Sequence, residues 1–195
     1  MLRRGAAGLL IASMILVPGY LLFVKDDDKA PSPADSDLVE AARDPNKAAE
    51  VLIEGVADPA QGITVNHPSG WDGSVARGVV RVIGDDGPTA IAITTEGKAN
   101  QAKEVFKDTV NGLKGELKGA KVALVPAEKA GAIAGLPSAQ AVVTGTDSAG
   151  NPHTTLVAVA RGEKRTYVVT VVSPPDGGQL GVANLILARG LTLSG

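Results

Sequence analysis

The sequence predicts an α+β protein, in which a mostly antiparallel β-sheet is flanked by helices and an N-terminal transmembrane helix precedes the domain. Three observations support this prediction. A long uncharged segment lies within the first 24 residues, the later segments follow the order strands, helix, strands, helix, and short turn-forming stretches link the strands. Strands grouped in this way are typical of an antiparallel sheet with helices packed on it.

Composition limits the classes of protein that the chain can represent. It has 195 residues, no cysteine and a formal net charge of −2. The lack of cysteine excludes a disulfide framework, a thiolate metal site and a lipid anchor attached to cysteine. The weak negative charge gives no sign of a nucleic-acid surface, so we expect no nucleic-acid partner.

Residues 1–24 are predicted to form a short cytoplasmic stub and a membrane anchor. Residues 5–24 carry no charge, and a helix of this length is about 30 Å long, which matches the hydrocarbon core of a bilayer. The alternative is a cleavable signal peptide whose shorter apolar region ends at Pro18 and Gly19, but the bulky residues 20–25 that follow offer no small-x-small cleavage site. The predicted anchor residues are Leu9, Leu10, Ile11, Ile15, Leu16, Val17, Leu21, Leu22 and Phe23.

The charges on either side of this segment predict its orientation. Arg3 and Arg4 precede it, whereas Asp26, Asp27 and Asp28 follow it. The positive-inside rule therefore places the N-terminus in the cytoplasm and the rest of the chain outside the cell membrane, as in a single-pass protein. The lipid bilayer is thus the first expected partner.

Residues 25–36 are predicted to be an acidic, proline-rich tether, and residues 37–57 a helical linker segment. Ser36 can cap a helix that starts at Asp37, and Asp44 followed by Pro45 is typical of a second helix start, here continuing to about Val56. The apolar stripe of this second helix is expected to pack on the domain or on a membrane neighbour.

Residues 58–195 are predicted to be the extracytoplasmic domain. Residues 63–66 and the valine-rich residues 75–83 are expected strands, and a Gly-Asp-Asp-Gly-Pro turn leads from the second into a strand at residues 89–94. Apolar residues at three- and four-residue spacing predict an amphipathic helix over residues 98–117. The helix face consists of Val105, Phe106, Val110, Leu113 and Leu117.

The second half of the domain is predicted to contain a further group of strands and a closing helix. Short turn-forming stretches after residues 146 and 160 predict hairpins between the last three strands. The expected strands are residues 121–125, 131–134, 139–146, 154–160 and 166–172, and the helix is residues 181–188.

Several landmarks resemble the PsbP-like superfamily, which includes actinobacterial LpqN-type envelope proteins. They are a His-Pro-Ser-Gly-Trp sequence at residues 67–71, a Gly-Leu-Pro-Ser-Ala sequence at residues 135–139, the helix between them, and a final Arg-Thr-Tyr-Val-Val-Thr strand followed by a helix. The resemblance covers about residues 63–193. It implies an α/β/α sandwich and a role in binding another macromolecule rather than in catalysis, and it carries over no cofactor or ligand residues.

Candidate site residues are few. Trp71 and His67 are a possible partner contact, although Trp71 can equally be a core residue on its glycine-flanked loop. His67 lies near Asp72 and Ser69, so a hydrolase site is a remote alternative. The acidic turn at residues 85–86 could hold a cation together with the turn at residue 176, but Asp-Gly sequences are primarily turn formers. We expect neither a metal nor another cofactor.

The function that the sequence favours is a non-catalytic, membrane-tethered extracytoplasmic binding module. We expect an accessory subunit or an assembly or stability factor of a membrane or envelope complex, with integral membrane or envelope proteins as partners. A carrier or sensor of a small envelope ligand, a lipid or a glycan held in a cleft, is the alternative.

Overall fold

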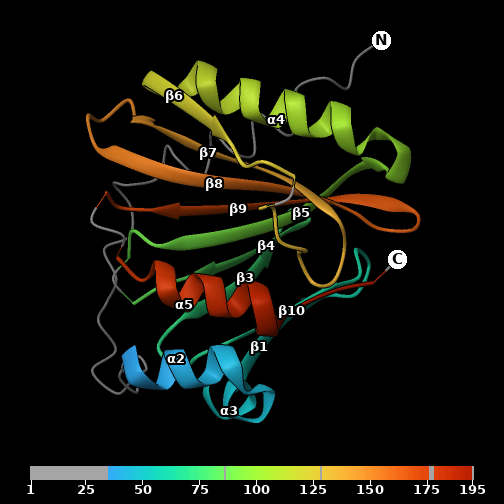
Figure 1. Cartoon of the computed structure of the whole chain (residues 1–195), viewed down its shortest axis with the longest axis vertical. Helices are drawn as coiled ribbons and strands as arrows, with labels where there is room; N and C mark the ends of the chain where they lie inside the picture. The colour runs from blue at the N-terminus through green and yellow to red at the C-terminus, as the bar shows by residue number, and fades with distance from the viewer. Residues whose placement is uncertain (1–34, 86, 128, 176–177, 195) are drawn as a thin grey trace.

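The protein is described by a computed structural model that covers residues 35–85, 87–127, 129–175 and 178–194 (Figure 1). The predicted anchor, its flanking charges and the tether up to residue 34 lie outside the described residues. Within the described part, none of the helices is long and apolar enough to cross a membrane.

A seven-stranded, fully antiparallel sheet forms the centre of the domain, which confirms the α+β prediction. The last four strands of this sheet along the chain form a meander, and its final strand pairs with β5 from the first group. In spatial order the strands are β3 (Asp72–Ala76), β4 (Val79–Ile83), β5 (Ala90–Lys98), β9 (Arg165–Ser173), β8 (Pro152–Arg161), β7 (Ser138–Thr146) and β6 (Lys118–Leu124).

A second, three-stranded sheet packs beside the large one. Its strands follow the order β1 (Glu54–Asp58), β2 (Ile63–His67) and β10 (Leu191–Leu193), so the end of the described chain pairs with a strand near its beginning. Gln61, in the turn between β1 and β2, joins the two sheets, because its Nε2 donates to the Gly78 carbonyl and its Oε1 accepts from the Thr95 amide at 3.0 Å.

Helices cover both faces of the large sheet. On one face lies α4 (Ala102–Glu116), preceded by the 3₁₀ turn η1 (Ala99–Gln101). The other face is covered by the small sheet and by helices at the two ends of the described chain, and Figure 1 shows these at the opposite end of the molecule from α4. These helices are α2 (Asp35–Arg43), α3 (Pro45–Val51), α5 (Leu180–Leu185) and the π-helical turn η2 (Ile186–Gly190).

Each face of the sheet has its own core. The core under α4 contains Leu113 and the sheet residues Val143 and Val157, which are fully buried. The core on the other face is larger and includes Trp71 and Tyr167. Helices α2 and α3 each contribute buried alanine to this second core, so they pack on the domain, which is one of the two positions expected for them.

Three predicted elements are wrong in part. The predicted strand at residues 75–83 is two strands, β3 and β4, because Arg77 and Gly78 form a two-residue turn with φ of 52° and 74°. Residues 131–134 are not a strand, since Ala134 and Gly135 make a similar turn with φ of 50° and 77°, and a single bridge joins Ile133 to Leu136.

The third error concerns the second helix. It ends at Val51 instead of about Val56, and residues 54–58 pair with β2 as strand β1. Strand pairing therefore prevails over the helical spacing of the apolar residues at this point.

Candidate functional site

The loop after β2 contains the two residues predicted as a possible partner contact, and both are buried. His67 ends β2 with 3% of its surface exposed, and Trp71 is 1% exposed. A turn brings them together, in which the Trp71 amide donates to the Pro68 carbonyl and Gly70 has a φ of 91°. Of the two positions that the sequence allowed for Trp71, the structure has the core position.

The His67 ring packs between the two sheets. Its Nδ1 lies 3.1 Å from the Pro68 carbonyl oxygen, and its Nε2 faces Gly73 of β3 so closely that a Cβ at Gly73 would lie 2.6 Å away. The side-chain hydrogen bond of this ring, among the described residues, is thus to backbone rather than to the hydroxyl and carboxylate that a hydrolase would need. A partner contact through His67 or Trp71 stays a prediction and requires this loop to open.

A histidine–carboxylate pair occurs instead in the hairpin between β7 and β8. His153 Nε2 donates to Asp147 Oδ2 at 2.9 Å, and Asp147 is fully buried. The other Asp147 oxygen accepts from the Ala149 amide at 2.9 Å and the Asn151 amide at 2.8 Å. The pair therefore stabilises a tight turn.

The electrostatics of Asp147 follow from these contacts. Burial alone raises the pKa of a carboxyl group, but hydrogen bonds from His153 and Asn151 outweigh it and lower the pKa of Asp147 to about 2. From the sequence pattern, this segment is predicted only to be a turn. The Asp-Ser-Ala-Gly-Asn sequence at residues 147–151 was the available signal, since aspartate commonly accepts hydrogen bonds from the backbone of its own turn.

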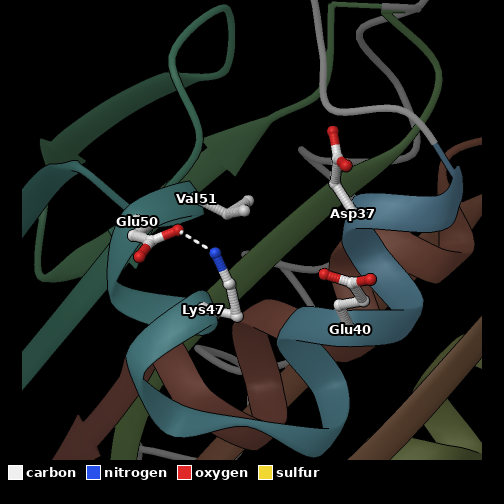
Figure 2. Close-up of a pocket in the computed structure, with 5 residues that line it drawn as sticks. All are labelled: Asp37, Glu40, Lys47, Glu50 and Val51. Carbon is white, nitrogen blue, oxygen red and sulfur yellow. Dashed lines mark hydrogen bonds and ion pairs between the residues drawn. The ribbon is translucent and has the colours of Figure 1, made fainter.

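A polar pocket of about 230 Å³ lies between α2 and α3 (Figure 2). Lys47 Nζ donates to Glu50 Oε2 at 2.8 Å, while Figure 2 shows Asp37 and Glu40 on the facing helix. The hydrogen bond to Glu50, and the charges of Glu50, Glu40 and Asp44, raise the pKa of Lys47. With one apolar lining residue, Val51, this pocket does not suit a lipid.

The metal hypothesis gains no support from the described residues. No group of three or more His, Asp or Glu side chains in this part of the chain is arranged to hold an ion. Two members of the predicted acidic site, residues 86 and 176, lie outside the described residues.

The edge of the large sheet presents a different surface. Strand β6 lies at the end of the sheet order and pairs with β7 alone among the described strands. Leu124 is 67% exposed and Val122 is 37% exposed, and both lie on this strand. An open edge strand can pair with a strand of another chain, and exposed apolar side chains on it favour such binding.

The architecture defines the class of protein as an antiparallel-sheet α/β/α sandwich. Neither a family model nor a curated protein matches the chain. A solved structure from Bacteroides thetaiotaomicron matches with a TM-score of 0.52 and 16% identity, covering 74% of this chain and 50% of that one. The chain thus spans half the length of that protein, and the likeness shows a shared fold.

In fold, the chain is also similar to PsbP-like proteins. CyanoP, the cyanobacterial PsbP of Synechocystis sp. PCC 6803, matches with a TM-score of 0.47 and 15% identity over 72% of this chain and 92% of that one. LpqN of Mycobacterium tuberculosis, described as involved in cell envelope biogenesis, matches with a TM-score of 0.44 and 13% identity, over 73% and 90% of the two chains.

Proposed function

We propose that the protein is a non-catalytic, membrane-tethered binding module on the extracytoplasmic side of the cell membrane. The observation that carries this proposal is the open β6 edge, where Leu124 and Val122 remain exposed on a strand that pairs with β7 alone among the described strands. Monomeric domains rarely leave large apolar side chains together on an unpaired strand, because such edges pair with other chains.

The two histidines support a binding role over catalysis. The ring of His67 is bound to backbone, and that of His153 is bound to a buried carboxylate within a turn. General acid–base chemistry needs a titrating group within reach of a substrate, and both rings are already engaged in packing or turn formation.

A tether makes a modest contact surface sufficient. Anchoring a domain beside a membrane-embedded partner raises its effective concentration, so that weak contacts lead to stable association. On this basis the partner is an integral membrane or envelope protein, and the module acts as an accessory subunit or an assembly or stability factor.

Fractionation tests the tether. The full-length protein with a C-terminal tag is expected to stay with membranes after alkaline washing, and external protease should remove the tag from intact spheroplasts. Leu16→Asp places a charge within the predicted span, which makes membrane insertion about 3 kcal/mol less favourable. This variant should release the protein from the membrane, whereas Leu16→Ile should not. A mature chain found free in the medium, beginning after Val24, would contradict the proposal.

Mild detergent extraction tests the subunit role. The tagged protein is expected to elute with a stoichiometric membrane or envelope protein, at a mass above that of a single chain in its micelle. Elution as a lone monomer would contradict the role as a subunit even if the tether is real.

A further inference from the structure

We propose that the β6 edge binds an extended acidic peptide segment of the partner protein, which joins the large sheet as an additional strand. The inference rests on the proposed binding function and names the chemistry of the partner. We define the β6 edge surface as Lys118, Lys121, Val122 and Leu124 of β6 with Lys107 and Lys114 of α4.

The backbone of β6 is set up to accept a strand. The Val125 amide donates to the Gln140 carbonyl at 2.9 Å, and Leu124 pairs with Ala141 in the antiparallel register. Residues of an antiparallel pair alternate between hydrogen-bonded and non-hydrogen-bonded positions. The backbone N–H and C=O groups of residues 121, 123 and 125 therefore point toward β7. The N–H and C=O groups of Val122 and Leu124 therefore point away from the sheet, where a new strand would lie.

The side chains of the same two residues supply an apolar strip. Val122 lies opposite Val143 and Leu124 opposite Ala141, and both partners are fully buried in the core under α4. Directly opposed residues share a face of the sheet. Val122 and Leu124 thus extend this core to the sheet edge, where alternate apolar residues of an added strand would cover them.

The charge of the surface determines which segment fits. Lys118 and Lys121 are exposed on β6, and Lys107 and Lys114 are exposed on α4, seven residues apart and so on one flank of the helix. Asp108 lies on the other flank. Burial and the nearby Asp108 carboxylate raise the pKa of Glu96 in β5, so Asp108 lies on the side of α4 toward β5, and Lys107 and Lys114 lie on the opposite flank.

The two ends of the domain differ in charge. Residues 98–130 contain seven lysines and four acidic residues, whereas residues 35–58 contain seven acidic residues and two basic ones. Figure 1 shows α4 with β6 at one end of the molecule and α2 with α3 at the other. The β6 end therefore attracts an acidic segment.

The same lysines provide discrimination. Lysine on an edge strand opposes pairing with a basic strand, including β6 of a second copy, because like charges would lie side by side. Opposite charges across two strands stabilise pairing. The surface thus favours an acidic partner strand both by attraction and by exclusion of the alternatives.

Binding of a designed probe tests this proposal on the full-length protein in detergent micelles. The probe is a short synthetic peptide of alternating glutamate and valine, and the comparison peptide replaces each glutamate with lysine. The glutamate peptide is expected to bind, to protect the Val122 and Leu124 amides from hydrogen exchange, and to bind more weakly at about 0.5 M salt. Equal binding of the lysine peptide would overturn the proposal.

Two variants at one position separate the backbone contribution from the side chain. Leu124→Pro removes the outward N–H while leaving the ladder to β7, and proline is tolerated on an edge strand with its N–H side outward. It should weaken probe binding at least about tenfold, whereas Leu124→Ala should weaken it less. Unchanged binding to Leu124→Pro, or protection on the other sheet edge, would overturn the proposal.

A charge-reversal variant tests the proposal independently in case Leu124→Pro does not fold. Lys121→Glu keeps the strand and should shift preference from the glutamate peptide to the lysine peptide. Binding of anionic phospholipid vesicles that competes with the probe and survives Leu124→Pro would identify a lipid surface instead and refute the strand proposal.

The outcome is separable from that of the proposed function. A chain that co-elutes with its membrane partner regardless of Leu124→Pro would leave the binding module intact and remove the β6 assignment. A chain that elutes alone yet binds the glutamate peptide at β6 would remove the accessory-subunit role and leave this site.

Discussion

Replacing Asp147 with asparagine should destabilise the domain through the β7–β8 turn. The Asp147 carboxylate accepts hydrogen bonds from the Ala149 and Asn151 amides, from the Asn151 side chain and from His153. An asparagine side chain at position 147 can accept through one oxygen, and its NH₂ group would face a donor. The variant therefore loses at least one hydrogen bond in a fully buried position.

The pKa of Asp147 gives the magnitude. The difference between the ordinary value of 3.8 and the value of about 2 corresponds to about 2 kcal/mol of stability at neutral pH. Because the pKa is lower in the folded state, this contribution is present above pH 3.8 and is lost as the pH falls through about 2. We expect Asp147→Asn to lower the unfolding free energy by about 2 kcal/mol at pH 7, and by less at pH 3.

Urea unfolding of the full-length protein in detergent, followed by Trp71 fluorescence, measures both values. Glu163→Gln is the matched control, since it removes a carboxylate from the exposed turn of the neighbouring hairpin and should change stability by less than about 0.5 kcal/mol. If Asp147→Asn behaves like this control, or if its effect is the same at pH 7 and pH 3, the account of the turn is wrong.

Three further predictions concern packing, charge and backbone. Leu113→Ala should lower the free energy of unfolding by about 2–5 kcal/mol because Leu113 is fully buried. Leu124→Ala, at an exposed position, should lower it by less than about 0.5 kcal/mol, and chemical denaturation measures both values. Burial raises the pKa of Glu116, whose Oε2 is buried without a hydrogen-bond partner in the described structure, so Glu116→Gln should raise the melting temperature at pH 7 but not below pH 4.5. Gly78→Ala should lower stability by about 1–2 kcal/mol because φ is 74°, whereas Arg77→Asn should raise it, with both measured by thermal melting.

Elements that carry their own periodic signal were predictable from the sequence. Helix α4 follows from the spacing of Val105, Val110 and Leu113, all of which are buried. Strands β7, β8 and β9 follow from long Val- and Thr-rich runs between turn-forming stretches. In these segments local propensity and tertiary packing favour the same structure.

Elements that exist only through pairing were not predictable. Strand β10 has three residues, and β1 follows a helix that its own sequence would continue. Both strands pair with β2, which is adjacent to β1 in the sequence but lies at the other end of the described chain from β10. The Arg77 turn was missed for a related reason, since arginine rarely adopts positive φ and the valines around it read as a single strand.

The candidate site differs from the predicted contact because exposure depends on neighbours. Trp71 and His67 were chosen for residue type and loop position, yet the loop folds inward between the two sheets. The helical spacing of the lysines of residues 98–121 is visible in the sequence, but the strand edge beside them is not.

The position of β6 at the sheet edge follows from the topology. Strands β6 to β9 form a meander, and β9 pairs with β5, so the first strand of the meander has to lie at the free side. Leu117 alone separates α4 from β6, and the buried strand residues under α4 come from β7, β8 and β9. Leu124 is exposed because no described element can reach past this edge, and strand addition from another chain would complete both its hydrogen bonds and its apolar cover.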